Sequence, residues 1–294
     1  MFKLIFSLLL ICLHGHQAIA SCETSWKISN IKKISTGDNF VCAMGDSIEC
    51  RGKKNKYGIS EIPYLKQPKD LSSDGNGACA IDEEGLKCWG SMKYTSEVPQ
   101  LKNPSEVSFK TPDALCVANN EEVECRAQKG GKIVLPFGIK HVSQLSLGGD
   151  YGSYFGSPRF GCGIVSGQLE CWGDNYYGQT DAPQTSNPMA IAVGEKHSCV
   201  LDDSKVKCWG DWGTNGQTIV PKGLNSVTQL VAYPFETCAL KSNGEISCWG
   251  MGSYLMPPKN LFAAKQVVIG RFFKCALGSD EVRCWGSGDS CPQF

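Results

Sequence analysis

The chain of 294 residues is 41% hydrophobic, which is enough for a packed core and argues against a disordered chain. Its 29 basic residues equal its 29 acidic residues in number, so it lacks the broad positive field on which non-specific nucleic-acid binding depends. We therefore expect a folded protein without a nucleic-acid partner.

The first twenty residues have the features of a secretory signal peptide. Lys3 provides the positive start, residues 4–13 the apolar segment, and Ala18-Ile19-Ala20 the small residues of a cleavage site. The apolar segment is too short to span a bilayer, and no later stretch approaches the required length. We expect residues 1–20 to be removed and residues 21–294 to form one exported domain, extracellular or periplasmic and cell-surface, without a transmembrane segment.

An alternative reading of the same segment is a lipoprotein signal. Ile19-Ala20-Ser21-Cys22 resembles a bacterial lipobox, which would place an acyl chain on Cys22. The polar residues 14–17 between the apolar segment and this site are atypical of a lipobox. We therefore favour ordinary cleavage after Ala20 over a lipid anchor.

Cysteine usage also indicates export. Seventeen cysteines are encoded, and removal of Cys12 with the signal leaves an even number, as in the disulfide framework of an exported protein. Zinc ligation is the alternative for a chain rich in cysteine. It is disfavoured because no Cys-x-x-Cys pair occurs and only His141 and His197 follow the signal. We expect neither a metal nor another cofactor.

Most of these cysteines form pairs that recur along the chain. The members of a pair are eight to ten residues apart, and successive pairs follow after 36 to 40 residues, apart from one step of 46. Such a period indicates a repeat protein. Turn-forming residues lie between two short apolar segments in each pair, so the two cysteines face each other across an antiparallel hairpin, within reach of a disulfide. The expected structural disulfides join Cys42 to Cys50, Cys79 to Cys88, Cys116 to Cys125, Cys162 to Cys171, Cys199 to Cys208, Cys238 to Cys248, and Cys275 to Cys284.

In five repeats the second cysteine opens a Cys-Trp-Gly triplet, whose tryptophan we interpret as packing between repeats. Residues 193–201, followed by Cys208-Trp209-Gly210 and Gly216-Gln217, resemble a repeat of the regulator of chromosome condensation (RCC1-like) family. The cysteine-rich form is similar to exported members, including secreted bacterial β-lactamase inhibitor propellers and plant crinkly-type receptor ectodomains. The resemblance implies an all-β fold, a seven-bladed β-propeller of four-stranded antiparallel blades with one disulfide per blade.

The two remaining cysteines lie near the ends of the mature chain. The last repeat stops at Cys291-Pro292, before the fourth and outermost strand expected of a blade, and spare residues precede Ile31. Because the ends of a closed propeller meet, we expect a Cys22–Cys291 disulfide to clasp them.

Candidate catalytic groups are scattered. The acidic pairs Glu83-Glu84, Glu121-Glu122 and Asp202-Asp203 fall in hairpin turns of different repeats, where side chains are solvated and cannot converge on one substrate. His197 occupies a repeat position two residues before a cysteine, so we interpret it as structural. Asp174-Asn175 lacks the further carboxylates of a calcium loop and reads as a turn. We predict that the protein is not an enzyme.

One insertion and several aromatic residues indicate a binding surface. The long step in the spacing comes from residues 148–159 of the fourth repeat, which are rich in glycine, serine and tyrosine, as adaptable binding loops are. In an up-and-down blade this insertion emerges on the same side as the loops that follow the Cys-Trp-Gly triplets. Packing against neighbouring blades is the alternative role for these aromatic residues. The predicted partner-binding residues are Tyr151, Tyr154, Phe155, Tyr176, Tyr177 and Trp212.

These observations favour a secreted, monomeric propeller that recognises a protein partner. The resemblance suggests inhibition of another enzyme as one form of this role. A glycan-binding propeller is the alternative, and a propeller hydrolase or lyase is less favoured. Exposed aromatic residues flanked by amides would favour the lectin, whereas carboxylates clustered at one mouth of the ring would favour the enzyme.

Overall fold

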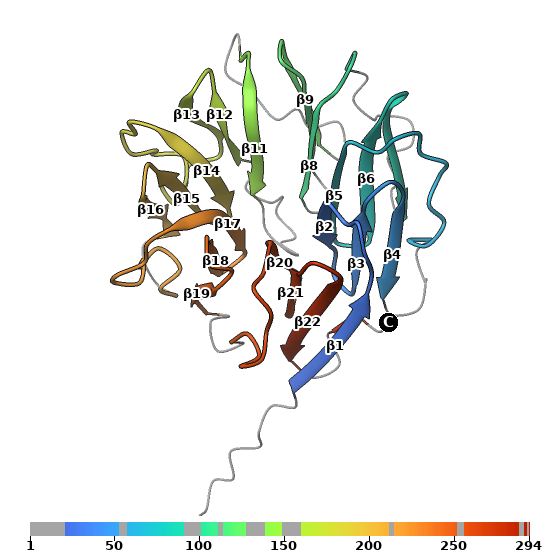
Figure 1. The fold of residues 1–294 in the computed structure, drawn as a ribbon. Coiled ribbons are helices and arrows are strands. Elements are labelled where there is room, and N and C mark those ends of the chain that lie inside the picture. Colours follow the sequence, from blue (N-terminus) through green and yellow to red (C-terminus); the bar gives the residue numbers. More distant parts are fainter. Residues whose placement is uncertain are drawn as a thin grey trace, which may run out of the picture.

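The fold was analysed in a computed structural model that describes residues 21–52, 58–90, 101–110, 114–127, 139–148, 160–211, 215–251, 256–287, 291–292 and 294. Within these residues the chain forms 22 β-strands and no α-helix. The strands build seven antiparallel sheets that surround a common axis (Figure 1). The all-β prediction is therefore confirmed for the part of the chain that the structure describes.

Each sheet contributes three consecutive strands, and we name these inner, middle and outer by their distance from the axis. The inner strands are β2 (Lys33–Thr36), β5 (Asp70–Asp74), β8 (Glu106–Lys110), β11 (Val142–Gly148), β14 (Pro188–Val193), β17 (Val227–Tyr233) and β20 (Gln266–Ile269). The middle strands are β3 (Phe40–Met44), β6 (Gly77–Asp82), β9 (Ala114–Ala118), β12 (Phe160–Val165), β15 (His197–Asp202), β18 (Glu236–Lys241) and β21 (Phe273–Leu277). The outer strands are β4 (Ile48–Gly52), β7 (Gly85–Gly90), β10 (Val123–Ala127), β13 (Gln168–Gly173), β16 (Lys205–Gly210), β19 (Ile246–Gly250) and β22 (Glu281–Ser287).

The inner strands close the ring. Each contacts the inner strand of the next sheet, and β20 of the seventh sheet contacts β2 of the first. The hydrophobic core lies between neighbouring sheets, where apolar faces pack on each other. Phe40 of the first sheet, for example, packs with Leu71 and Trp89 of the second. The triplet tryptophans belong to these interfaces, and the Trp209 indole N–H donates to the Gln179 carbonyl of the linker before its sheet.

Four strands per sheet are present only in the seventh sheet of the described structure, in the order β1-β22-β21-β20. After the outer strands of the fourth and fifth sheets the chain turns, because the Gly178 N–H donates to the Asn175 carbonyl and the Ile219 N–H to the Gly216 carbonyl. Gly178 and Gly216 have φ of 73° and 76°, which turns require and strands do not use. The expected fourth strand is therefore not confirmed for these sheets, because turn residues interrupt it.

The fourth strand of the seventh sheet comes from the N-terminal end of the described residues. Strand β1 (Ser21–Lys27) pairs antiparallel with β22, and Ser21 lies opposite Ser287. The Cys22–Cys291 disulfide joins the same two regions, with 5.9 Å between its Cα atoms. The two ends of the chain thus complete one sheet together.

Seven further disulfides lie inside the sheets, one in each. Every one joins directly opposed residues of a middle and an outer strand, and their Cα atoms are 4.0–4.1 Å apart. The pairing expected from the spacing of the cysteines is therefore confirmed in each sheet. From the first sheet to the seventh, the bonds join Cys42 to Cys50, Cys79 to Cys88, Cys116 to Cys125, Cys162 to Cys171, Cys199 to Cys208, Cys238 to Cys248, and Cys275 to Cys284.

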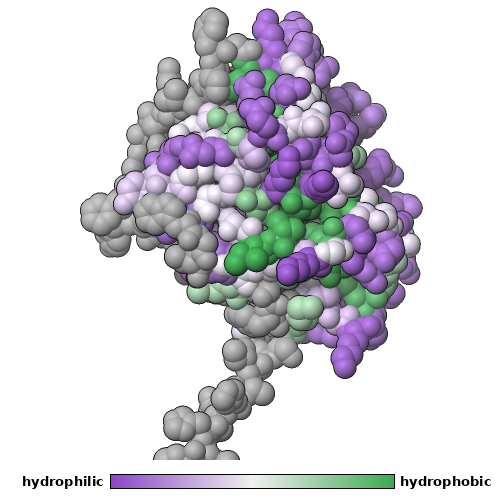
Figure 2. Space-filling view, turned by 90° about the vertical axis from the view of Figure 1, so that its left-hand side faces the viewer, coloured by the Kyte–Doolittle hydropathy of each residue, from purple (hydrophilic) through white to green (hydrophobic). Residues whose placement is uncertain are grey.

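The side of the ring that lies on the left in Figure 1 carries an apolar patch bordered by polar side chains (Figure 2). Large apolar side chains exposed on the fourth to sixth sheets and their linkers include Met189, Ile219 and Met251, with 51%, 67% and 57% of their surface accessible. None of the described residues forms a helix long and apolar enough to cross a membrane.

Candidate functional site at the mouth of the channel

The inner strands surround a central channel, and the two ends of that channel differ. At the end where the strands begin, side chains of one sheet reach the backbone of the next. The Gln266 amide of the seventh sheet accepts the Ile34 N–H at 2.7 Å and donates to the Ile34 carbonyl at 3.0 Å. We call the residues that make such contacts the bridging ring. They are Asp70, Glu106, Gln144, Gln229 and Gln266.

Glu106 carries the only strongly perturbed carboxyl of the bridging ring among the described residues. It accepts the Leu145 N–H at 2.7 Å, as Gln144 accepts the Ile191 N–H in the next sheet. Burial, together with the nearby Asp70 charge, raises the pKa of Glu106 from 4.5 to about 7. This carboxyl is thus only partly ionised at neutral pH.

The other half of the channel contains a cavity of about 190 Å³. The residues that line it come from the second halves of the inner strands of all seven sheets, and they include several serines. Its lining ends at Asp74 and Tyr233, the last residues of β5 and β17. The cavity therefore lies toward the end of the ring where the inner strands finish.

Four polar residues surround that end, and we call them the channel mouth: Asp38, Asp74, Tyr233 and Arg271. The Arg271 guanidinium lies 3.7 Å from the Asp38 carboxylate, and the Asp38 N–H donates to the Gly75 carbonyl beside Asp74. Burial raises the pKa of Asp38, and Arg271 opposes this effect. Burial, with the charges of Asp74 and Asp38, also raises the pKa of Tyr233 well above its usual value. Tyr233 is therefore a neutral phenol beside two acidic side chains.

Aromatic and cationic side chains continue outward from the channel mouth. The Lys196 ammonium lies 4.7 Å from the centre of the Tyr177 ring and 6.0 Å from that of Phe235. Tyr176 meets Tyr177 edge-on, with ring centres 4.9 Å apart, and 70% of its surface is exposed. Cation–π contacts of this kind orient a cation without removing its positive charge.

The seventh sheet adds a second aromatic group. Phe272 is 57% exposed, and the Arg271 guanidinium lies 5.5 Å from its ring centre. Met251, also 57% exposed, follows β19 and donates its N–H to the Phe235 carbonyl. We call the channel mouth together with the surrounding residues the C-terminal face. These surrounding residues are Tyr176, Tyr177, Lys196, Phe235, Met251 and Phe272.

The structure describes two of the six residues predicted to bind a partner. Tyr176 is exposed, whereas Tyr177 is partly buried against Lys196, so both roles weighed for these aromatics occur in one loop. Phe160 pairs with Gly148 on one side and with Gly173 on the other. The residues that flank 149–159 and the start of the Tyr176 loop therefore lie at the same end of the strands of the fourth sheet. Four predicted residues lie outside the described part of the chain: Tyr151, Tyr154, Phe155 and Trp212.

The search for binding residues in the sequence missed several members of this face. Lys196, Phe235 and Phe272 all stand three residues before the first cysteine of their repeats, where the first two repeats have Asn39 and Asn76. A position that changes from amide to cation to aromatic within a regular repeat is a usable signal of a binding surface. It is visible only after the repeats have been aligned on their cysteines.

The histidine and acidic residues considered from the sequence lie in structural environments. His197 is fully buried, and its Nε2 lies 2.9 Å from the Thr237 hydroxyl of the next sheet. Asp202 accepts two linker backbone N–H groups and the Lys207 ammonium, which holds its turn in place. Glu83 and Glu84 pair with neighbouring lysines at the surface of the second sheet.

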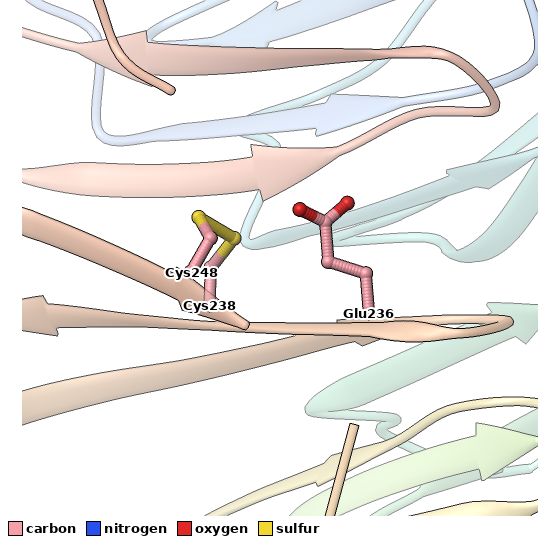
Figure 3. Close-up of side chains that lie close together, drawn as sticks. All are labelled: Glu236, Cys238 and Cys248. Carbon is pink, nitrogen blue, oxygen red and sulfur yellow. A yellow bond between two sulfur atoms is a disulfide. The ribbon is translucent and has the colours of Figure 1, made fainter. Parts of the chain in front are cut away.

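One cluster in the described residues has three groups of the kinds that bind metals: Glu236, Cys238 and Cys248. Figure 3 shows the carboxylate beside the Cys238–Cys248 disulfide on the sixth sheet. Sulfurs joined in a disulfide are not thiolates, and thiolates are the form in which cysteine ligates zinc. The Glu236 carboxylate also forms a buried ion pair with Lys274, at 2.8 Å. The cluster is therefore better explained by packing between sheets than by metal binding.

Comparison with known proteins finds a matching repeat family and solved structures with a similar fold. Residues 190–217 match the family model of the regulator of chromosome condensation (RCC1) repeat. No curated protein sequence matches the chain. A similar fold occurs in the ectodomain of the Physcomitrella patens receptor kinase CR4, with a TM-score of 0.67 and 24% identity, covering 91% of this chain and 74% of that one.

Two further structures extend the comparison. The ectodomain of the Arabidopsis thaliana receptor kinase ACR4 has a TM-score of 0.66 and 22% identity, covering 90% of this chain and 97% of that one. Yeast RCC1 (Prp20), solved with Kap60, has a TM-score of 0.63 and 14% identity, covering 87% and 80% of the two chains. The resemblance to the RCC1 family is therefore confirmed, by sequence in one repeat and by fold over most of the chain.

Proposed function

We propose that the protein is an exported propeller that binds a protein partner through its C-terminal face. The observation that carries this proposal is the group of exposed aromatic and cationic side chains around the channel mouth, of which Tyr176 and Phe272 are the most accessible rings. Large aromatic residues and arginine are typical of the residues that dominate protein interfaces. Export is supported by the eight disulfides and by the similarity to receptor ectodomains.

The immediate surroundings of the aromatic residues favour a protein over a glycan. Carbohydrate recognition would need amide groups directed outward beside the rings. In the Tyr176 loop the Asn175 amide donates to Asp181, and the fully buried Gln179 amide donates to Asp174. The charged neighbours Lys196 and Arg271 flank the rings instead. Charges of this kind select protein partners by electrostatic complementarity.

A capture experiment with matched variants tests the proposal. The wild-type protein, the variant Tyr176→Ala/Phe272→Ala, and the variant Tyr64→Ala are each immobilised and exposed to culture medium or envelope extract. Tyr64 is 80% exposed and lies in the linker between the first two sheets, so it controls for loss of an exposed ring elsewhere. We expect the partner to bind wild type and Tyr64→Ala, and the double face variant to bind more weakly by roughly 30-fold, or about 2 kcal/mol, for each ring removed. Equal capture by all three proteins would refute the C-terminal face as the binding site.

The specific form that we propose is inhibition of another exported enzyme. It follows from the similarity of the cysteine-rich repeats to secreted β-lactamase inhibitor propellers. Titrating the captured partner's activity with wild-type protein should give loss of activity that saturates at a fixed molar ratio. Full activity in the saturated complex would refute inhibition but leave recognition intact.

A propeller hydrolase or lyase is the second candidate, and one observation favours it. Asp38 and Asp74 bring two carboxyls to one mouth of the ring, as an acid–base mechanism requires. A screen of chromogenic glycosides and esters should show no turnover if recognition is the function. Turnover that disappears in both Asp38→Asn and Asp74→Asn would favour the enzyme instead.

A further inference from the structure

We propose that the channel mouth receives a basic side chain, a lysine or an arginine, from a loop of the bound protein. This inference rests on the proposed function, because it assigns the chemistry of the contact at the centre of the C-terminal face. The aromatic residues around the mouth then hold the surface of the partner that carries this side chain.

The first observation is the shape of the site. The cavity of about 190 Å³ is lined by the second halves of the inner strands and ends at Asp74 and Tyr233. A buried water needs roughly 10–15 Å³ of such space, so the cavity has room for more than about ten waters or for a long side chain. A cavity lined by the inner strands of all seven sheets can receive one side chain from a bound protein.

The second observation is the charge. Asp38 and Asp74 belong to neighbouring sheets, and the one cation of the channel mouth is Arg271. Arg271 lies 3.7 Å from Asp38 and half of its side chain is exposed, so solvent weakens this pair. The described residues of the channel mouth thus bring two carboxyl groups together with one guanidinium, next to a cavity whose walls carry several serine hydroxyls. An incoming ammonium or guanidinium group would donate hydrogen bonds to these carboxyl oxygens.

The third observation concerns buried oxygen atoms. The Ser73 hydroxyl lines the cavity, Ser73 is only 7% exposed, and this hydroxyl has no hydrogen-bond partner among the described residues. The same holds for Oδ1 of Asp38. A buried polar group without a partner destabilises the fold, so a ligand that donates hydrogen bonds here gains from the contact. Carboxylate and hydroxyl oxygens accept the several N–H donors that lysine and arginine present.

A bound metal ion fits these residues less well. Within the described part of the chain, the one set of three close metal-ligating groups is that around Glu236, and it excludes Asp38 and Asp74. The Phe272 ring centre lies 5.5 Å from the Arg271 guanidinium. An aromatic ring beside the channel mouth is therefore placed to contact an organic cation. The oxygen acceptors, the Phe272 ring and the cavity therefore all fit a basic side chain.

Titration with a small probe tests the site without knowledge of the partner. Arginine amide and its neutral analogue citrulline amide are titrated onto the full-length mature protein by calorimetry or NMR. We expect saturable binding of arginine amide and at least tenfold weaker binding of citrulline amide. Asp74→Asn should weaken arginine amide at least tenfold, whereas Asp46→Asn, an exposed aspartate at the opposite end of the first sheet, should not. Equal binding of the two amides, or no effect of Asp74→Asn, would overturn the proposal.

A second measurement identifies the source of the cation. A displayed library of random peptides is selected on wild-type protein and on Asp38→Asn, with tryptophan fluorescence confirming that both are folded. We expect lysine or arginine to be enriched at one peptide position on wild type and at least fivefold less on Asp38→Asn. Selected peptides without a basic preference, from a protein that still binds arginine amide, would assign the mouth to a free small cation. Absence of any peptide binding would instead contradict the proposed function itself.

Discussion

The two ends of the central channel are formed by the same inner strands, but their polar side chains are used differently. At the bridging ring, side chains such as Gln229 and Gln266 bond to the backbone of the next sheet. At the channel mouth, the Ser73 hydroxyl and Oδ1 of Asp38 have no hydrogen-bond partner among the described residues. One end therefore contributes hydrogen bonds that hold the ring together, whereas the other carries buried oxygen atoms whose hydrogen bonds the described residues do not supply, as the proposed ligand site requires.

The largest expected effect comes from opening the ring on which both ends depend. Replacing Cys22 and Cys291 with alanine should lower the free energy of unfolding by about 5 kcal/mol, because their disulfide closes nearly the whole chain. Replacing Cys199 and Cys208 should cost about 2–3 kcal/mol, because they close a short hairpin. Denaturant unfolding of both variants measures the difference. Equal losses would show that closing the ring adds no more stability than closing one hairpin.

A bridging-ring substitution should be the next most damaging. Gln266→Ala removes both bonds to Ile34, which is fully buried, and leaves its N–H and carbonyl without these partners. We expect a loss of about 2–4 kcal/mol in denaturant unfolding, with binding through the C-terminal face unchanged in the folded fraction. Gln184→Ala, in an exposed linker, is the matched control and should change stability by less than about 0.5 kcal/mol. A similarly small effect of Gln266→Ala would show that the hydrogen bonds of the bridging ring do not stabilise the fold.

The pH dependence of the free energy of unfolding tests the role of Glu106 in the bridging ring. Its pKa is higher in the folded chain than in the unfolded one, so the folded state binds more protons and stability falls as pH rises from about 4.5 to about 7. A tenfold difference in proton affinity corresponds to about 1.4 kcal/mol, and we expect a loss of roughly 2–3 kcal/mol across this window. Glu106→Gln, which reproduces the residue type at Gln144, should be more stable than wild type at pH 8 by that amount. Identical pH profiles for the two proteins would contradict this account.

The smallest expected stability effect is at the channel mouth. Burial raises the pKa of Asp38, so its ionised form is disfavoured in the fold, and stability falls as pH rises through that pKa. Asp38→Asn should therefore raise the melting temperature slightly at pH 8, by less than Glu106→Gln does, while it weakens binding of arginine amide. Thermal unfolding at pH 5 and pH 8 measures the first effect. A destabilised variant at pH 8 would mean that Asp38 supports the ring instead of the ligand site.

Much of the fold could be predicted because the sequence repeats. The cysteine pairs fix the register of the middle and outer strands, since directly opposed residues such as Cys42 and Cys50 must share one sheet. Ring closure could be predicted from the two cysteines left over, Cys22 and Cys291. The fourth strand could not, because described linkers such as those at Gly178 and Gly216 turn where a strand was expected. A family resemblance does not show which linkers turn and which continue the sheet.

The candidate site was less accessible from the sequence. Tyr176 stands out as an aromatic residue in a loop, but Asp38, Asp74 and Tyr233 belong to different repeats, and only the closed ring brings them together. The bridging ring was missed for another reason. Its members occupy one position of the repeat but include aspartate, glutamate and glutamine, so their common contact with the next backbone is visible only in three dimensions.

The pairing of β1 with β22 affects the order in which the sheets can form. A ribosome makes β1 first and β22 last, so β1 remains an unpaired edge while the other sheets form from strands that are close in sequence. An exposed strand edge is a template for pairing with other chains. The interval before Cys22 meets Cys291 is therefore the period of greatest risk of aggregation, and oxidation of this one disulfide marks its end.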